Sequence, residues 1–485
     1  MSSQLLDSPA KTAARVSGRT PAVIRLLVLA TFVVILNETL LLNAIPELMT
    51  ALSIDAQTAQ WLSTAFMLTM AAVIPITGWF LQRVSTRSAY ATAMSLFLAG
   101  TALAAAAPSF EVLLGARIVQ ASGTAVMMPL LMTTLMQVVP EQDRGRVMGN
   151  VTLAISVAPA MGPAISGLIL QFGSWRLLFV LVLPIAALIA WGGLKQLKNV
   201  GEPKLGTVDW FSVVAAAAGF GGLVYGLSRF EGGDVGTAAA IVAGGLATIV
   251  VFVFRQLSLQ KRDAPLLDLR TLRHRTYTVA LILMSVAFMA MLGSMILLPL
   301  YLQNVRGLAA LETGLLMMPG GLAMGLLGPT VGRLFDRFGG RVLVVPGAIG
   351  IMLALTGFTQ ITMTTPYWQL LGLHALLMVS LAATFTPVFT LGLGALPPRL
   401  YSHGSSILST LQQVAAAIGT ALVITVMSAR ADALKATGVT EALASLDGMR
   451  LAFIIGAALS VAVVVTALLL PARAENAGEI TGAGH

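Results

Sequence analysis

The sequence predicts an all-α integral membrane protein with fourteen transmembrane helices. Hydrophobic residues make up 57% of its 485 residues and charged residues only 10%, whereas a soluble domain is about 25% charged. The mean hydropathy is +0.89, and apolar runs of about 20 residues, enough to cross a bilayer as a helix, recur along almost the whole chain. Lipid offers the backbone no hydrogen bonds, and these runs are far longer than barrel strands, so each is expected to be a helix.

The expected helices follow one another closely along the chain. They cover residues 24–45, 58–80, 89–107, 111–138, 147–170, 176–195, 209–228, 236–255, 276–302, 312–332, 342–361, 366–395, 404–428 and 450–471. The first 20 residues are polar and basic, and no small-residue cleavage site follows a short apolar core. The first helix is therefore expected to stay in the protein rather than to be removed as a signal peptide.

The basic residues are distributed unevenly between the two sides of the expected membrane. Of the 29 Lys and Arg residues, 22 fall in the even-numbered loops and the two tails, 6 fall in the odd-numbered loops, and Arg117 lies inside a span. This bias predicts that both termini are cytoplasmic, and it explains the net charge of +9 without a nucleic-acid partner. The absence of Cys excludes disulfides and thiolate metal sites.

Two loops resemble each other and predict an internal duplication. "GWFLQRVSTRS" begins at Gly78 and "GRLFDRFGGRV" at Gly332, and Pro75 and Pro329 share the same offset. The expected organisation is an N-terminal tail (1–23), a six-helix bundle (24–200), an inserted two-helix hairpin (201–262), a second six-helix bundle (263–472) and a C-terminal tail (473–485). Transporters built from such repeats hold substrate at the repeat interface near the midplane.

One acidic residue is expected deep inside a span. The run "FVVILNETLLLNAIPELM" at 32–49 carries Asn37 and Glu38, although a carboxylate at the bilayer centre costs about 3 kcal/mol. A role in binding and releasing a proton would explain why an acidic residue stands here despite this cost. Two alternatives remain open: a protonated packing contact between helices, or a position of Glu38 at the outer headgroups.

Other polar residues inside the expected spans are candidates for contacts with substrate. Gln120 and Thr124 share a helix face with Arg117, at helical spacing. Asn37 and Gln413 are further candidates. His374, the sole histidine expected within a span, is either a satisfied core residue or a group that senses protons or touches substrate.

A third group of residues is predicted to control conformational change. In "APAMGPAISG", small residues permit close helix contact and prolines bend the helix. Charged residues of the two repeated loops are expected to form charge pairs and helix-end contacts that close the cytoplasmic side, or to anchor the topology only. The predicted residues are Gly78, Arg83, Arg87, Gly162, Pro163, Gly167, Asp336, Arg337, Gly339 and Arg341.

These motifs resemble a known family. Gly332, Asp336, Arg337, Gly339 and Arg341 match the loop pattern G-x-x-x-D-R-x-G-R-R of the major facilitator superfamily. The segments "LNETLLLNAIP", "QWLSTAF", "GARIVQASGTA", "GPAISG", "SWRLLFVLVLP" and "PLYLQNVRG" are together similar to those of the fourteen-helix drug:proton antiporters.

The resemblance implies the major facilitator fold and roles for several residues. It places Arg117 near the first helix, where the arginine would favour the ionised form of Glu38 or tether the helix to backbone carbonyls. It implies that the Gly162 segment acts as the hinge and seal found in exporters. Three departures stand out: Gln82 replaces the usual Asp of the first loop, Ser85 replaces its usual Gly, and Asn37, beside Glu38, replaces the Asp that many members carry in the first helix.

The expected function is proton-coupled export of amphipathic organic molecules across the bacterial cytoplasmic membrane. The spacing of a phosphate-binding P-loop is absent from the sequence, so the proton gradient is the expected energy source. No cofactor, metal or enzymatic activity is expected, and the chain is expected to act as a monomer surrounded by lipid. The alternatives are a dedicated exporter of one metabolite, siderophore or self-made antibiotic, and a non-transporting membrane receptor or scaffold.

Overall fold

The structure is a computed structural model that describes residues 21–42, 44–197, 199–200, 206–230 and 235–473. Every regular element in this part of the chain is helical. The long helices are α1 (Ala22–Leu42), α3 (Ala56–Arg83), α4 (Thr86–Ala105), α5 (Phe110–Val138), α6 (Arg144–Phe172), α7 (Arg176–Gln196), α8 (Trp210–Arg229), α9 (Val235–Gln260), α10 (Arg275–Leu300), α11 (Ala310–Phe338), α12 (Arg341–Phe358), α13 (Tyr367–Gly394), α14 (Tyr401–Lys435) and α15 (Glu441–Leu469). The short ones are α2 (Ile45–Leu52), η1 (Glu141–Asp143), η3 (Leu269–Arg273), η4 (Tyr301–Val305) and η5 (Pro398–Leu400).

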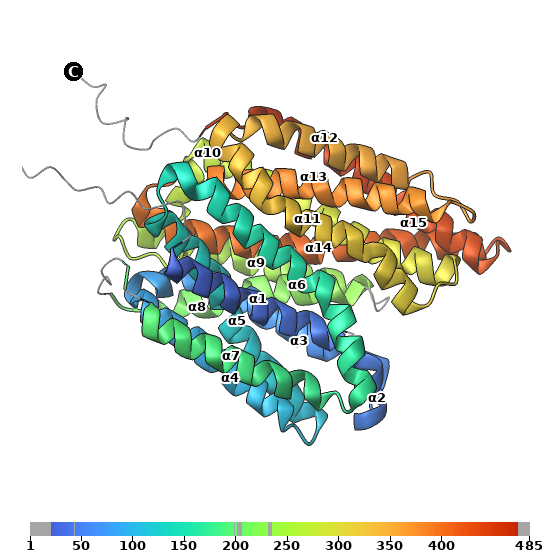
Figure 1. Ribbon diagram of the computed structural model, residues 1–485, viewed down its shortest axis with the longest axis horizontal. Coiled ribbons are helices and arrows are strands. Elements are labelled where there is room, and N and C mark those ends of the chain that lie inside the picture. The colour runs from blue at the N-terminus through green and yellow to red at the C-terminus, as the bar shows by residue number, and fades with distance from the viewer. Residues whose placement is uncertain (1–20, 43, 198, 201–205, 231–234, 474–485) are drawn as a thin grey trace, which may run out of the picture.

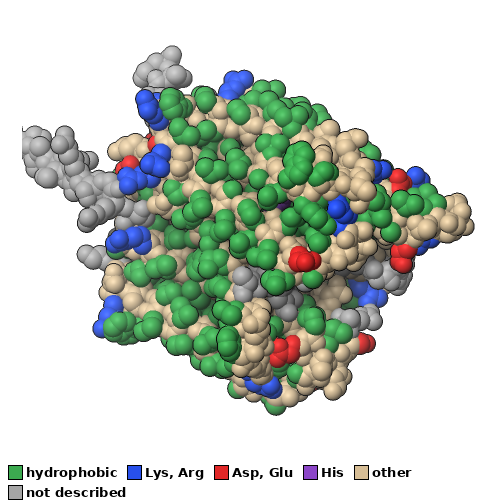
Figure 2. Space-filling model, turned by 45° about the vertical axis from the view of Figure 1, so that its right-hand side comes forward, with side chains coloured by type: hydrophobic (Ala, Val, Ile, Leu, Met, Phe, Trp, Pro, Cys, Tyr) green, Lys and Arg blue, Asp and Glu red, His purple; other side chains and the backbone are tan. Residues whose placement is uncertain are grey.

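The predicted fold class is confirmed, since the described residues contain fourteen helices long and apolar enough to cross a membrane. Their order and positions follow the prediction. Hydrophobic side chains cover the middle of the molecular surface, and most of the charged ones gather toward its two ends (Figure 2). This distribution fits a protein surrounded by lipid, with its loops in water.

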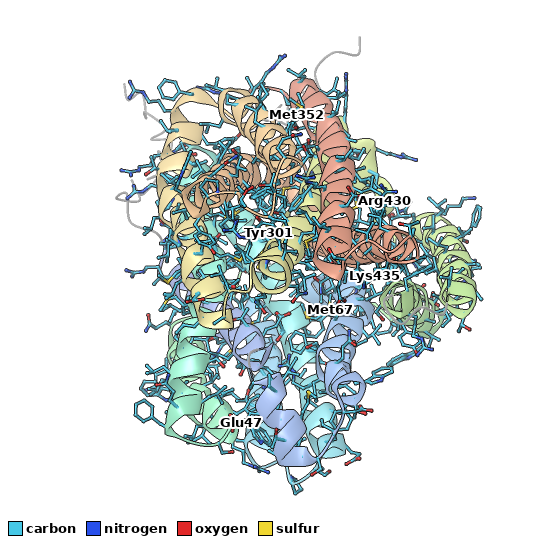
Figure 3. The ribbon with its side chains drawn as sticks, turned by 90° about the vertical axis from the view of Figure 1, so that its right-hand side faces the viewer. Glu47, Met67, Tyr301, Met352, Arg430 and Lys435 are labelled. Atoms are coloured by element: carbon cyan, nitrogen blue, oxygen red, sulfur yellow. The ribbon has the colours of Figure 1, made fainter. Side chains whose placement is uncertain are left out.

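The C-terminal pair of helices departs from the prediction. Residues 429–449 were expected to form a loop, but α14 continues to Lys435 and α15 begins at Glu441. Arg430 pairs with Asp447 at 2.7 Å and Lys435 with Glu441 at 3.2 Å, so charged residues are accommodated on helices outside the apolar region. With 35 residues, α14 is about 52 Å long, which exceeds the roughly 30 Å of hydrocarbon. Figure 3 looks onto this end and shows Arg430 and Lys435 on the projecting pair.

The helices form two groups that lie side by side. In Figure 1, α1 to α7, drawn in blue to green, occupy the lower part, and α10 to α15, in yellow to red, occupy the upper part. The groups meet along two seams, where α6 packs on α11 and α3 packs on α14. The α8–α9 hairpin packs on α3 and α14 through α8. It therefore flanks the second seam, whereas the first has no such cover among the described residues.

Glycines bring α6 and α11 into backbone contact. A Cβ added to Gly149 would lie 2.8 Å from the carbonyl carbon of Gly328, and one added to Gly328 would lie 2.6 Å from the carbonyl oxygen of Gly149. One added to Gly332 would lie 3.0 Å from Cα of Arg146. Real side chains do not fit such spaces, so this seam requires glycine at these positions.

Candidate functional site

Glu38 lies on α1 within the N-terminal group of helices. Helix α1 packs against α5, α6 and α7, and the carboxyl group of Glu38 interacts electrostatically with Arg117 of α5. In the described structure the two side chains form no direct ion pair. The neighbouring Asn37 is buried, and its Nδ2 has no hydrogen-bond partner among the described residues. The α1–α5 contact thus brings an acidic and a basic side chain into electrostatic reach of each other among the apolar helices.

Arg117 is at the centre of a buried polar network. It is 2% exposed, and its Nη1 donates to Oε1 of Gln120 at 2.9 Å. Nε2 of Gln120 donates to Oγ1 of Thr101 on α4, also at 2.9 Å. The guanidinium lies 4.0 Å from the ring centroid of Phe66, a cation–π contact. The network fixes Arg117 in the bundle interior, while the Coulomb interaction is its link to Glu38.

The predicted substrate contacts lie in different surroundings. Gln120 has no exposed surface and Thr124 is buried. The Thr124 hydroxyl donates a hydrogen bond to the Gln120 carbonyl. Both therefore face the interior of the N-terminal group in this conformation. Gln413 on α14 is half-buried. His374 on α13 is buried against α11, where a Cβ at Gly320 would lie 2.7 Å from its Nε2.

The Gly162 segment packs on α1 at Thr39 and Leu40, the two residues that follow Glu38. A Cβ at Gly162 would lie 2.7 Å from Cβ of Thr39, and the Ser166 hydroxyl donates to the Leu40 carbonyl at 2.8 Å. Ala160 of the same helix contacts Gly321 of α11. Helix α6 therefore touches the helix that carries Glu38 and the opposite half of the molecule. A Cβ at Gly167 would meet nothing within 4 Å.

The two repeated loops contact the opposite half by hydrogen bonds. The Asp336 carboxylate accepts one bond each from the backbone N–H groups of Gly145 and Arg146, both at 2.8 Å, at the positive N-terminal end of α6. Gln82 occupies the equivalent position in the first loop, and its amide donates to the Arg399 carbonyl at 2.9 Å. Both contacts lie at the same end of the molecule and join its two halves.

The expected charge pairs of these loops are absent from the described structure. Arg337 and Arg341 are exposed, and Arg337 lies over the Phe338 ring. Arg83 lies over Trp79, and Arg87 is exposed. Asp336 instead makes a contact of the second expected kind, with the backbone N–H groups at the N-terminal end of α6.

Buried hydroxyl groups join the two halves further toward the midplane. Each of three pairs links one helix of each half: Thr133 with Ser405 at 2.9 Å, Thr152 with Thr386 at 2.8 Å, and Thr77 with Ser406 at 3.3 Å. Together with the loop contacts they close this end. We call the end that carries the contacts of Gln82, Asp336 and these hydroxyl pairs the closed gate.

At the opposite end, equivalent arginines brace a loop within each half. Arg176 in "SWRLLF" donates to the Ala107 carbonyl at 2.7 Å, and Arg450 in "GMRLAF" donates to the Ile361 carbonyl at 2.6 Å. Neither was predicted, although the shared R-L-x-F pattern is visible in the sequence. The acceptors are separated by the same 254 positions as Gly78 and Gly332, as expected for a duplication. No cluster of His, Asp and Glu suited to a metal ion occurs among the described residues.

Comparison with known proteins identifies the family. A sequence profile of the Major Facilitator Superfamily matches residues 27–420. The chain is 39% identical over 440 residues to the uncharacterized MFS-type transporter YcnB of Bacillus subtilis, which covers 90% of this chain and 92% of the relative. It is 40% identical over 436 residues to the lincomycin resistance protein LmrB of Listeria innocua, with 88% and 92% covered.

Solved structures agree with this fold. The proton:xylose symporter XylE superposes with a TM-score of 0.63 at 14% identity, covering 90% of this chain and 94% of that one. The human organic anion transporter MFSD10 superposes with a TM-score of 0.62 at 17% identity, covering 91% and 100%. With its fourteen apolar helices, this multi-pass transporter belongs to the major facilitator superfamily and fits its drug:proton antiporter branch.

Proposed function

We propose that this transporter exports amphipathic organic compounds in exchange for protons. The observation that carries the proposal is the carboxyl group of Glu38 beside Arg117 within the membrane. When this carboxyl group is protonated, the protein can change conformation without the free-energy cost of moving a charge through an apolar region. The nearby arginine stabilises the ionised form. Relatives named for lincomycin resistance and for putative multidrug resistance support organic drugs as the substrate class.

The contacts between the two halves suggest how the transporter could alternate between its two open sides. The closed gate carries the loops that the charge bias assigns to the cytoplasm, so this conformation would be accessible from the outside. A proton entering from outside would neutralise Glu38. Because α6 contacts both α1 and α11, a change in charge at Glu38 can bias how the halves pack along the α6–α11 seam. We propose residues 24–200 and 263–472 as the two moving bundles, with 201–262 as the inserted hairpin.

Replacement of Glu38 tests the coupling. Glu38→Gln mimics the protonated acid permanently, so uphill efflux driven by a pH gradient should be lost while downhill equilibration of a neutral substrate persists. Glu38→Asp should retain part of the coupling. The measurement is substrate accumulation in proteoliposomes with and without an imposed pH gradient, with the exposed Glu111→Gln as the matched control. Concentration of substrate by Glu38→Gln at the parent level would refute this role.

A second candidate is a dedicated exporter of a single antibiotic. Several relatives are named for resistance to one compound, including LmrB of Bacillus subtilis at 36% identity. An efflux panel of chemically diverse compounds, lincomycin among them, in a strain without its own pumps separates the two. Protection against many scaffolds supports the multidrug role, and protection against one scaffold supports the dedicated exporter.

A further inference from the structure

The linker between α9 and α10 connects the inserted hairpin to the closed gate. Its segment η3 touches α14, and Cδ1 of Leu267 lies 3.3 Å from the position of a Cβ on Gly78. Asp268 is 4% exposed and pairs with Arg270 at 2.9 Å, which also reaches Asp263 at 2.8 Å. A buried carboxylate of the linker is thereby placed against the start of α14.

The base of the hairpin holds this linker by a continuous set of hydrogen bonds. Oε1 of Gln256 accepts from the backbone N–H groups of Leu266 at 2.8 Å and Leu267 at 3.1 Å. Its Nε2 donates to Ser212 at 2.8 Å, and Ser212 donates to Asp209. Asp209 also forms a two-pronged pair with Arg255 of α9. These bonds therefore join the linker to both helices of the hairpin.

His403 lies where the linker meets the gate. It is 3% exposed, it stands in the first turn of α14, and its Nδ1 lies 3.0 Å from the position of a Cβ on Gly78. Leu267, which precedes Asp268, lies against the same position on Gly78, so the histidine and the buried carboxylate meet at one junction. Helices α3, α5, α8, α10 and η3 pack against α14. The charged and titratable groups at this end of these elements and their flanks are Arg83, Glu141, Asp143, Arg144, Asp209, Arg255, Asp263, Asp268, Arg270, Arg273, His274, Arg275, Tyr277, Arg399 and Tyr401.

We propose that His403 and Asp268 form a protonation-dependent tie by which the inserted hairpin and its linker hold the gate closed. His403 is a positioning residue in this inference, which uses the proposed function only to assign the gate to the cytoplasmic side. The proton on His403 creates an attraction to the Asp268 carboxylate across the junction. Without that proton the attraction is lost, and the linker and α14 separate more readily.

The two neighbouring carboxylates keep their negative charge while His403 changes. The Arg255 hydrogen bonds lower the pKa of Asp209 to about 2. Burial opposes the charge of Asp268, but the Arg270 hydrogen bonds and the His403 charge leave its pKa below the usual range. Burial and Arg399 depress the pKa of His274. Both carboxylates therefore stay negative across the cytoplasmic pH range in which a histidine can gain a proton, and the neutral form of His274 is favoured.

The test measures how gate closure depends on pH. Spin labels on cysteines replacing Ser88 and Val342, exposed residues of the two halves, report the closed fraction in nanodiscs at about pH 8 and about pH 5.5. The parent should show about a threefold larger acid-induced rise in the closed-to-open ratio than His403→Gln. Asp268→Asn should show the same loss, and the double variant no further loss. Asp263→Asn, which removes the exposed partner of Arg270, should behave as the parent.

A charge-preserving variant separates the tie from a purely structural role. His403→Lys carries its charge at both pH values, so the gate should stay closed and this part of the pH response should vanish. Parent-like pH profiles in both His403→Gln and Asp268→Asn would overturn the tie. If one variant fails to fold, the other decides the outcome. Because the labels report conformation without transport, a failure of proton-driven efflux would refute the proposed function but leave this measurement valid.

Discussion

Two single residues at equivalent positions of the repeat close the same gate by different chemistry. The Asp336 carboxylate accepts from two backbone N–H groups at the start of α6, whereas the Gln82 amide donates to one carbonyl before α14. Hydrogen bonds to a charged group contribute about 1.5–3 kcal/mol, and neutral ones about 0.5–1.5 kcal/mol. The first contact should therefore stabilise the closed gate more than the second.

Asp336→Asn should lower the closed-to-open ratio about tenfold, and Gln82→Ala about threefold. Asparagine keeps the size of the side chain but loses the charge that faces the α6 N-terminus. The ratio is read from the same pair of spin labels on residues 88 and 342, and transport is compared at matched expression. Equal effects of the two replacements would contradict an unequal pair of latches.

The sequence identified several of these residues but not their partners. Glu38 and Arg117 stand out because charge is costly inside an apolar span, and Asp336 because its loop is repeated. The partners of Asp336 are backbone N–H groups, which every residue carries and which leave no pattern. The burial of Gln120 depends on Thr101 of a neighbouring helix, and helical spacing alone could not reveal that contact.

At the scale of helices, α6 joins the proposed proton site to the seam between the halves. Its glycines form two classes. Gly149 faces the α11 backbone and Gly162 faces Thr39 of α1, whereas Gly167 faces open space. The sequence grouped Gly162 and Gly167 as parts of one switch, since both belong to a small-residue motif. Only the packing distinguishes glycines that permit close contact from those that do not.

Alanine replacements on α6 should separate these classes. Gly149→Ala should destabilise the protein and impair transport, because its Cβ would meet the Gly328 backbone. Gly167→Ala should keep transport and gain up to about 1 kcal/mol from helix propensity. Thermal unfolding in detergent and efflux assays give the two readouts. A Gly149→Ala protein as stable and active as the Gly167→Ala control would show that the seam tolerates a side chain.

At the scale of the whole molecule, the spans were predictable and the projecting helices were not. An apolar run of bilayer length must form a helix because lipid offers the backbone no hydrogen bonds. The order and approximate ends of the helices can therefore be read from the pattern of apolar residues. The extensions of α14 and α15 lie outside the apolar region, where hydropathy carries no signal. Ion pairs between the two helices, such as Arg430 with Asp447, support them instead.

Cysteine labelling tests the orientation that the charge bias predicts. A cysteine at the exposed Thr437 should react with an impermeant thiol reagent in intact cells, and one at the exposed Ser88 should react only after permeabilisation. The lack of native Cys removes any background. Two other expected positions are unsuited to this test, because Ser402 at the closed gate is buried and Gly232, between α8 and α9, lies outside the described residues. Labelling of Ser88 from outside would reverse the topology.

The paired helices of α14 and α15 also give this 50.5 kDa chain a recognisable landmark. A transporter of this size is largely hidden by its detergent belt in electron micrographs, so its particles are hard to align. A two-helix stem braced by ion pairs presents a firm epitope outside that belt. An antibody fragment raised against its tip would break the pseudosymmetry of the repeat and provide the reference needed to image successive conformations of the pump.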